Sequence, residues 1–159
     1  MESPVLSEGD AYKVLIELQA REQIKELRAR YCWYAVRADY EQIAALYVPN
    51  CVLSVPIEGK VVTSKGREGI MAYLQSRNLQ PLDVIPIVQN HIIKINGEEA
   101  WGTCTVFSHA APPGRVFVGR YHDRFRKLDG EWLFVERHLS YYMPKYDESD
   151  RDCYGIAPR

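Results

Sequence analysis

Apolar side chains in the first forty residues recur with the period of an α-helix. Most of them stand three, four or six residues apart, at Val14, Leu15, Leu18, Ile24, Leu27, Tyr31, Tyr34 and Ala38. This pattern predicts one long or bent helix that ends near residue 38. Ser7 and Asp10, which are three residues apart, supply the signal that starts it.

Shorter elements follow in the middle of the chain. Asp39 and Gln42 repeat the start signal and predict a short second helix, which Pro49 and Asn50 end. Residues 51–56 and 60–63 are predicted to pair as a hairpin around a turn at residues 57–59. A third helix is expected over residues 68–76, and residues 81–86 are expected to form a linker.

From residue 88 onward the pattern changes to strands separated by turns. We expect strands over residues 88–95, 100–109, 115–127 and 132–142, with hairpin pairs at Asn96-Gly97 and Asp129-Gly130 and a Pro-Pro-Gly turn at residues 111–114. Helices followed by such a meander predict the α+β class, with three N-terminal helices packed on one curved, mostly antiparallel sheet. Residues 1–142 are expected to form a single domain and residues 143–159 a C-terminal tail.

Composition narrows the function classes. The 159 residues carry 20 Lys and Arg against 21 Asp and Glu, a formal net charge of −1. This balance offers no electrostatic footprint for nucleic acid or an anionic membrane. No apolar run approaches the ~18 residues of a membrane span, and no secretory signal is visible at the start. The four cysteines are widely spaced, so we expect a reduced cytoplasmic protein without a metal site.

Several short motifs occur in a characteristic order. They are Ile24-Lys25-Glu26-Leu27 with Arg30-Tyr31, Asp39-Tyr40, Asn90-His91, Gly119-Arg120-Tyr121 with Asp123, and Asp129-Gly130 with Trp132. Together they resemble the SnoaL-like branch of the nuclear transport factor 2-like superfamily, which includes polyketide cyclases, scytalone dehydratase and bile acid 7α-dehydratase. The resemblance implies a cone-shaped α+β barrel that encloses one apolar cup, and a homodimer formed through the outer sheet face. The sequence contains no phosphate-binding loop or dinucleotide fingerprint, so we expect any chemistry to proceed without a cofactor.

The resemblance implies catalytic roles for two histidines. His91 shares a strand face with Ile93 and Ile95, and at this position related dehydratases carry a histidine that acts as a general acid or base. His109 aligns with a second active-site histidine and closes the strand face that holds Phe107. The alternatives are a hydrogen-bonded core histidine at 91 and a solvent-facing turn histidine at 109.

Tyrosines supply the second candidate group. Tyr31 matches a helix tyrosine at the active site of the resembled bile acid dehydratase, and Tyr34 lies on the same helix face. Tyr121 shares a strand face with Asp123. A tyrosine hydroxyl in an apolar cup can donate to a substrate oxygen and stabilise enolate charge. The alternative is that the eleven tyrosines build a core and a dimer surface.

The chain departs from the resembled pattern at one position. Many members of the family have an aspartate five residues after the Tyr31 position, where it pairs with the histidine, and this chain has Val36. We expect the Val36 side chain to line the cup beside His91. Catalysis by His91, Tyr31, His109 and Tyr121 would then proceed without that acid, with Tyr34, Val36, Asp123 and Phe107 contacting the substrate.

Two functions remain open at this stage. The first is a cofactor-independent lyase or isomerase, of the dehydratase or cyclase type, acting on an apolar cyclic carbonyl or hydroxy compound. The second is a non-catalytic ligand-binding or dimerisation module of the same fold. In both cases we expect a homodimer through an outer sheet face that carries Val106, Val118 and Val135, with no nucleic-acid or membrane partner.

Overall fold

The computed structural model describes residues 7–57, 59–110 and 115–142. The helices are α1 Glu8–Val36, α2 Tyr40–Ala45 and α3 Gly66–Ser76. The strands are β1 Tyr47–Ile57, β2 Lys60–Lys65, β3 Val84–Asn96, β4 Glu99–Ala110, β5 Arg115–Leu128 and β6 Glu131–Tyr141. The expected turn at residues 111–114, the expected tail at 143–159 and residue 58 lie outside the described residues.

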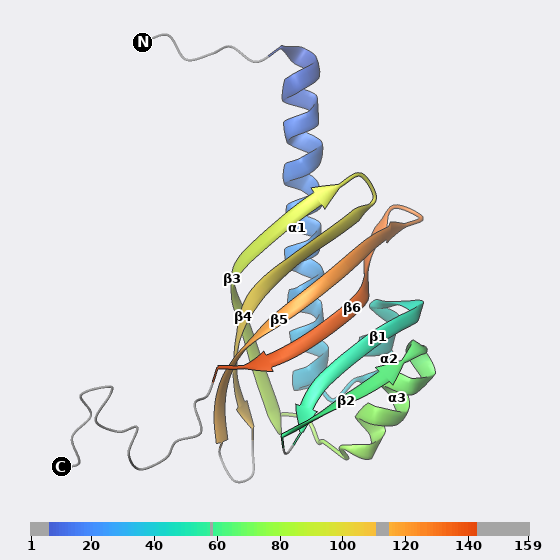
Figure 1. Cartoon of the computed structure of the whole chain (residues 1–159), viewed down its shortest axis with the longest axis vertical. Helices are drawn as coiled ribbons and strands as arrows, with labels where there is room; N and C mark the ends of the chain where they lie inside the picture. Colours follow the sequence, from blue (N-terminus) through green and yellow to red (C-terminus); the bar gives the residue numbers. More distant parts are fainter. Residues whose placement is uncertain (1–6, 58, 111–114, 143–159) are drawn as a thin grey trace, which may run out of the picture.

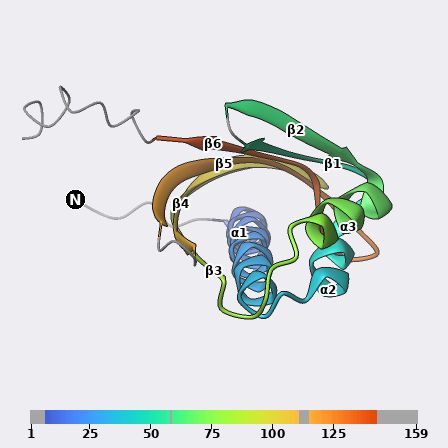
Figure 2. The same cartoon turned by 90° about the horizontal axis from the view of Figure 1, so that it is seen from below.

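The strands form one sheet in the order β2-β1-β6-β5-β4-β3, in which every pairing is antiparallel except the parallel pair β1 and β6. The sheet is open and bends around α1 (Figures 1 and 2). Helices α2 and α3 lie beside one end of α1 and cover that end of the concave face. The predicted α+β class, with helices packed on a curved and mostly antiparallel sheet, is confirmed.

Short-range signals determine the ends of several elements. The Ser7 side chain accepts a hydrogen bond from the Asp10 amide at 3.2 Å, and the Asp39 side chain accepts one from the Gln42 amide at 3.3 Å, so both helices begin where capping predicts. Between β5 and β6, Asp129 and Gly130 have φ angles of 51° and 84°. Two positive φ angles are what a tight hairpin turn of type I′ requires.

The first turns of α1 extend beyond the sheet (Figure 1). Val14, Leu15 and Leu18, which contribute to the helical period, are exposed, and the buried positions of α1 begin at Ala20. The predicted helix is therefore present over this stretch, although no described element covers its apolar residues.

Strand β3 begins at Val84, within the expected linker, and contains a bulge. Its pairing with β4 shifts between Gln89 and Ile92, and Asn90 has a φ of 55°. A bulge inserts an extra residue and interrupts the alternation of side chains. Val88 therefore packs against the core, while His91, three residues later, also faces inward and contacts α1.

Strand β4 presents the opposite face from the one expected. Val106 and Ser108 are fully buried in the concave side of the sheet, so the residues between them point to the convex side. Phe107 is accordingly 44% exposed and His109 is half-buried on that outer face. The prediction that Phe107 and His109 face the cup, and that Val106 lies on the outer face, is wrong.

No helix among the described residues is long and apolar enough to cross a membrane. The division into a domain over residues 1–142 and a tail stays a prediction.

Candidate functional site

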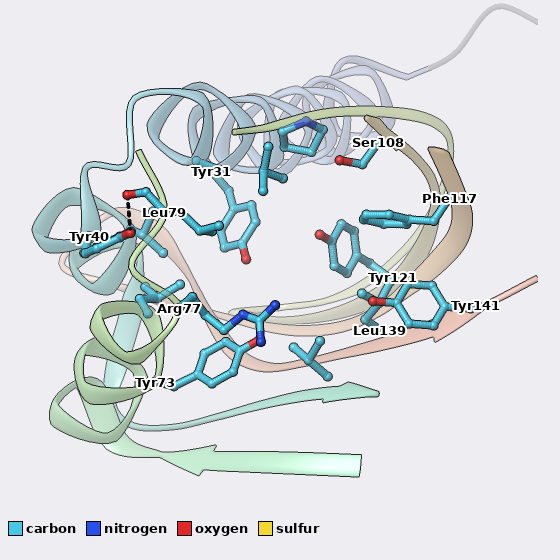
Figure 3. A pocket seen from close by; sticks show the side chains of 16 residues that line it. Tyr31, Tyr40, Tyr73, Arg77, Leu79, Ser108, Phe117, Tyr121, Leu139 and Tyr141 are labelled. Atoms are coloured by element: carbon cyan, nitrogen blue, oxygen red, sulfur yellow. Dashed lines mark hydrogen bonds between the residues drawn. The ribbon is translucent and has the colours of Figure 1, made fainter. Parts of the chain in front are cut away.

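A cavity of about 380 Å³ lies at the end of the concave face that α2 and α3 cover (Figure 3). Side chains from all three helices and from strands β1 and β3 to β6 line it. Its volume falls within the range of small-molecule sites, about 300–1,000 Å³. Most of the lining is apolar, and five tyrosines add hydroxyl groups: Tyr31, Tyr40, Tyr73, Tyr121 and Tyr141.

Tyr31 and Tyr121 form the deep wall of this cavity. Their ring centroids are 6.1 Å apart in an edge-to-face arrangement, and both hydroxyls point into the open space (Figure 3). The Tyr40 hydroxyl donates to the Leu79 carbonyl at 2.8 Å. Within the described part of the chain, the hydroxyls of Tyr31 and Tyr121 have no such partner, so they are available to a ligand.

Burial keeps both of these phenols protonated. It raises the pKa of Tyr31 and raises that of Tyr121 well above the usual 10.0, and the nearby Arg137 cation only partly offsets the rise. A phenol that resists ionisation is a hydrogen-bond donor at neutral pH. The two side chains can therefore donate to one oxygen, or to two neighbouring oxygens, of a bound compound.

A buried cation lies behind the two tyrosines. The Cζ atom of Arg137 is 4.3 Å from the ring centroid of Tyr31, 4.0 Å from that of Tyr121 and 4.1 Å from that of Phe134. Arg137 is fully buried. Burial disfavours its charge, but contact with Asp123 outweighs this and raises the pKa of Arg137, so the guanidinium stays charged against the aromatic faces.

Asp123 joins two buried arginines that come from different elements. It accepts hydrogen bonds from Arg137 Nε at 2.8 Å and Arg137 Nη2 at 2.9 Å, and from Arg28 Nε at 2.9 Å. All three side chains are fully shielded from solvent. One carboxylate between two guanidinium groups leaves one net positive charge, and Arg28 Nη2 and Arg137 Nη1 have no partner among the described residues.

His91 lies at the far end of this cluster. Arg28 Nη1 is 3.1 Å from His91 Nδ1. Because a guanidinium only donates, Nδ1 must accept, and the imidazole proton is then on Nε2. Burial, Arg28 and Lys25 lower the pKa of His91 from 6.5, against the opposing charges of Asp123 and Glu22. The ring is therefore neutral at pH 7 and is held in one tautomer.

The structure brings some of the predicted site residues together and separates others. Tyr31 and Tyr121 line the cavity, and Asp123 supports them through Arg137. His91 reaches the cluster through Arg28 but is not part of the cavity lining. Two others, Tyr34 and Val36, lie on the last turn of α1 and are outside the lining.

The placement of Val36 differs from the expectation that its side chain lines the cup beside His91. The residue ends α1, and its carbonyl accepts a hydrogen bond from the Leu82 amide at 2.7 Å. The contact that His91 makes is with Arg28, two turns earlier on the helix. His109 and Phe107 are also absent from the cavity lining, since they belong to the convex face of β4.

Sequence reasoning missed the two arginines that organise the site. Arg28 precedes Tyr31 by three residues, and i,i+3 spacing places both on one helix face. Arg137 is paired directly with Asp123 across β5 and β6. The helical spacing of Arg28 and the cross-strand pairing of Arg137 are both signals in the sequence. Arginines are nevertheless usually assigned to the solvent-exposed surface.

Among the described residues, no three His, Cys, Asp or Glu side chains are placed to hold a metal ion. Nor does any His, Asp or Glu of the described chain line the cavity. The chemistry available at its wall comes from phenols, one serine and one arginine.

A family model for the SnoaL-like domain matches residues 16–138. This stretch runs from within α1 into β6 and includes the buried charge cluster and all of the cavity lining except Leu139 and Tyr141. No protein with a curated description matches the chain in sequence.

Solved structures share the fold at low sequence identity. An NTF2-like protein with a cystatin-like fold from Novosphingobium aromaticivorans is 24% identical, with a TM-score of 0.72 over 94% of this chain and 97% of that one. A candidate scytalone dehydratase from the same organism is 22% identical, with a TM-score of 0.70 over 86% and 92%. A candidate dehydratase of the NTF2-like family from Streptomyces avermitilis is 17% identical, with a TM-score of 0.65 over 77% and 96%.

Proposed function

The chain belongs to the SnoaL-like domain family, and on that premise we propose that it is a cofactor-independent lyase or isomerase acting on an apolar cyclic carbonyl or hydroxy compound. The family includes dehydratases and cyclases. Two of the structures with the same fold are described as candidate dehydratases. The ligand would bind in the cavity behind α2 and α3, with its ring against the apolar lining.

The observation that carries this proposal is the pair of unpartnered phenols, Tyr31 and Tyr121, at the deep wall of the cavity. Both remain protonated, and the Arg137 cation lies against the faces of their rings. A positive charge behind a phenol stabilises negative charge that develops on the ligand oxygen to which the phenol donates its hydrogen bond. Fixed donors of this kind stabilise an enolate in a site that excludes water.

The reaction needs a proton acceptor as well as these donors. The C–H bond next to the polarised carbonyl breaks, and its electrons form the enolate. In an elimination the enolate electrons then expel the β-hydroxyl, which takes up the proton held by the base and leaves as water. In our proposal His91 takes the proton, because its lowered pKa keeps it neutral at pH 7. For this, His91 Nδ1 would have to leave its contact with Arg28 and approach the substrate. A base must lie within about 2.6–3.2 Å of the atom that carries the proton.

A second function is favoured by the composition of the lining. No His, Asp or Glu of the described residues contacts the cavity, and the resemblance to the family implies an aspartate at the position that Val36 occupies here. Both features suit a protein that binds the same class of compound without transforming it. The two functions share the tyrosine contacts and differ only in proton transfer.

Proton exchange on 2-tetralone, a cyclic ketone, separates the two functions. Binding is measured by calorimetry and exchange of the α-protons by NMR in heavy water. Tyr31→Phe and Tyr121→Phe should each weaken binding about fivefold, since one hydrogen bond contributes about 1 kcal/mol. His91→Gln should abolish exchange and leave binding intact. Tyr34→Phe, outside the cavity lining, is the control.

Each result has a distinct meaning. Exchange that His91→Gln removes supports the enzyme. Binding without exchange by the unchanged protein favours the ligand-binding module. If the Tyr31→Phe and Tyr121→Phe variants bind 2-tetralone as tightly as the Tyr34→Phe control, the cavity is not the binding site and both functions are refuted.

We also propose a homodimer through the convex face of the sheet. Four exposed apolar residues gather there on adjacent strands, Ile85 and Ile87 of β3, Phe107 of β4 and Val116 of β5. Such a patch is costly to leave in water. Sedimentation should give the mass of two chains, and Phe107→Glu should give one. A single-chain mass for the unchanged protein at micromolar concentration would refute it. A cytoplasmic location also stays a proposal.

A further inference from the structure

The cavity lining contains one charged side chain among the described residues, Arg77. It is the residue at which α3 ends, and its guanidinium reaches into the cavity beside Tyr73 (Figure 3). Burial raises the pKa of both Tyr73 and Tyr141, and the Arg77 charge partly opposes that rise for each. The guanidinium lies beside the Tyr73 ring, on the opposite side of the space from Tyr31, while Tyr141 lies farther along the wall next to Phe117.

Arg77 has no partner of its own in the described part of the chain. No carboxylate, carbonyl or aromatic face there binds its guanidinium, whereas Arg21, Arg67 and Arg126 each bond to a carboxylate or a carbonyl. Arg77 is exposed to solvent, so water hydrates its charge, and an anionic group of a ligand can replace that water at the guanidinium.

The position at a helix end does not account for this orientation. A cation is favoured at any helix C-terminus, and Arg37 at the end of α1 provides a direct comparison. Arg37 lies 6.0 Å over the Trp33 ring, outside the cavity lining. An arginine can therefore interact favourably with a helix end without directing its guanidinium into a cavity.

We propose that Arg77 binds a carboxylate carried by the ligand, so that the substrate is an amphipathic cyclic acid. This deepens the proposed function of the same cavity and rests on it. A guanidinium presents paired N–H donors that match the two oxygens of a carboxylate. The Tyr73 hydroxyl lies beside the guanidinium and can donate to the same group. The ring of the acid would then extend toward Tyr31 and Tyr121, whose hydroxyls donate hydrogen bonds to the carbonyl or hydroxyl oxygen of the ligand.

The arrangement gives the cavity two ends with different chemistry. At the Arg77 end the group bound is negatively charged from the start, and it orients the molecule. At the Tyr31 and Tyr121 end the oxygen is neutral until reaction begins. Binding energy from a part of the substrate that does not react is what holds the reacting carbon in place.

The test compares two probes of nearly equal shape, 2-naphthoate and 2-naphthamide, at pH 7, where the first is an anion. Affinities are measured by calorimetry for the unchanged protein, for Arg77→Gln, for Arg77→Lys, and for Arg37→Gln as the matched helix-end control. A partly exposed ion pair contributes about 1 kcal/mol, which predicts about a fivefold preference for the anion.

We expect Arg77→Gln to abolish the preference by weakening 2-naphthoate alone. Arg77→Lys should keep part of it, since the charge remains and the paired donors are lost, and Arg37→Gln should keep all of it. Equal binding of both probes by the unchanged protein, or a preference that survives Arg77→Gln, overturns the carboxylate assignment and leaves the cavity proposal standing. If neither probe binds, both the carboxylate assignment and the proposal that the cavity is the binding site are refuted.

Discussion

Removing the charge of Asp123 by the substitution Asp123→Asn tests whether the buried cluster depends on its single anion. Asparagine has nearly the same shape, so packing is preserved. The carboxylate accepts three hydrogen bonds, two from Arg137 and one from Arg28. In the variant, two guanidinium groups face one neutral amide, whose NH₂ group cannot accept from either of them.

The loss follows from the burial of all three side chains, none of which is exposed to solvent. Breaking a buried ion pair by removing one partner destabilises a protein by about 3–5 kcal/mol. Here the anion serves two cations at once, so we expect about 4 kcal/mol or slightly more. With a typical slope of about 2 kcal/mol per molar urea, the midpoint of unfolding should fall by about 2 M.

Urea unfolding followed by tryptophan fluorescence measures this shift. The matched control is Glu136→Gln on the neighbouring strand, which breaks the exposed pair with Arg124 at 2.8 Å and should cost about 1 kcal/mol or less. If Asp123→Asn proves too unstable to purify, adding Arg28→Met removes one of the stranded cations and should recover folded protein. A loss for Asp123→Asn equal to that of Glu136→Gln would refute the idea that the cluster is an electrostatic unit.

Two further predictions concern His91 and Gly102. The pKa of His91 is lowered from 6.5 by burial, Arg28 and Lys25, so the unfolded chain binds a proton that the folded chain does not, and the stability present above pH 6.5 is lost as the pH falls toward the folded value. The free energy of unfolding should be lower at pH 5.5 than at pH 7.5 in the unchanged protein and in His122→Gln, an exposed control. The decrease should be smaller in His91→Gln. An equal decrease in all three proteins would contradict this prediction. Gly102→Ala would place a Cβ atom 2.1 Å from the Ile92 carbonyl oxygen at the β3 bulge, and should cost about 1–3 kcal/mol. Gly9→Ala, with open space around it, should be neutral or stabilising by up to about 1 kcal/mol, and similar melting temperatures for the two variants would disprove the steric argument.

Much of this fold can be predicted from short stretches of sequence. The caps at Ser7 and Asp39 and the turn at Asp129-Gly130 depend on residues within three positions of one another. The α+β class follows from the order of helical and alternating segments, and the shared inward face of Tyr121 and Asp123 follows from strand alternation. Such features are determined locally, so the chain's own spacing is sufficient to reveal them.

Other features depend on which elements meet. Both faces of β4 carry apolar residues, and alternation alone cannot tell that Val106 is buried while Phe107 is exposed. The first apolar residues of α1 follow a helical period, but no described element covers them. These outcomes depend on where the sheet ends and which side of it bends toward α1.

The candidate site shows the same division most clearly. The family resemblance, together with strand alternation, pointed to Tyr31, Tyr121 and His91, each from its own element. Only the tertiary structure brought Arg28 to Asp123, 95 positions away, and placed Arg137 against both tyrosines. Arginines in a sequence are ordinarily assigned to the surface, because burying their charge is unfavourable without a partner. Here the partner comes from another strand, so the site exists only once helix and sheet are packed together.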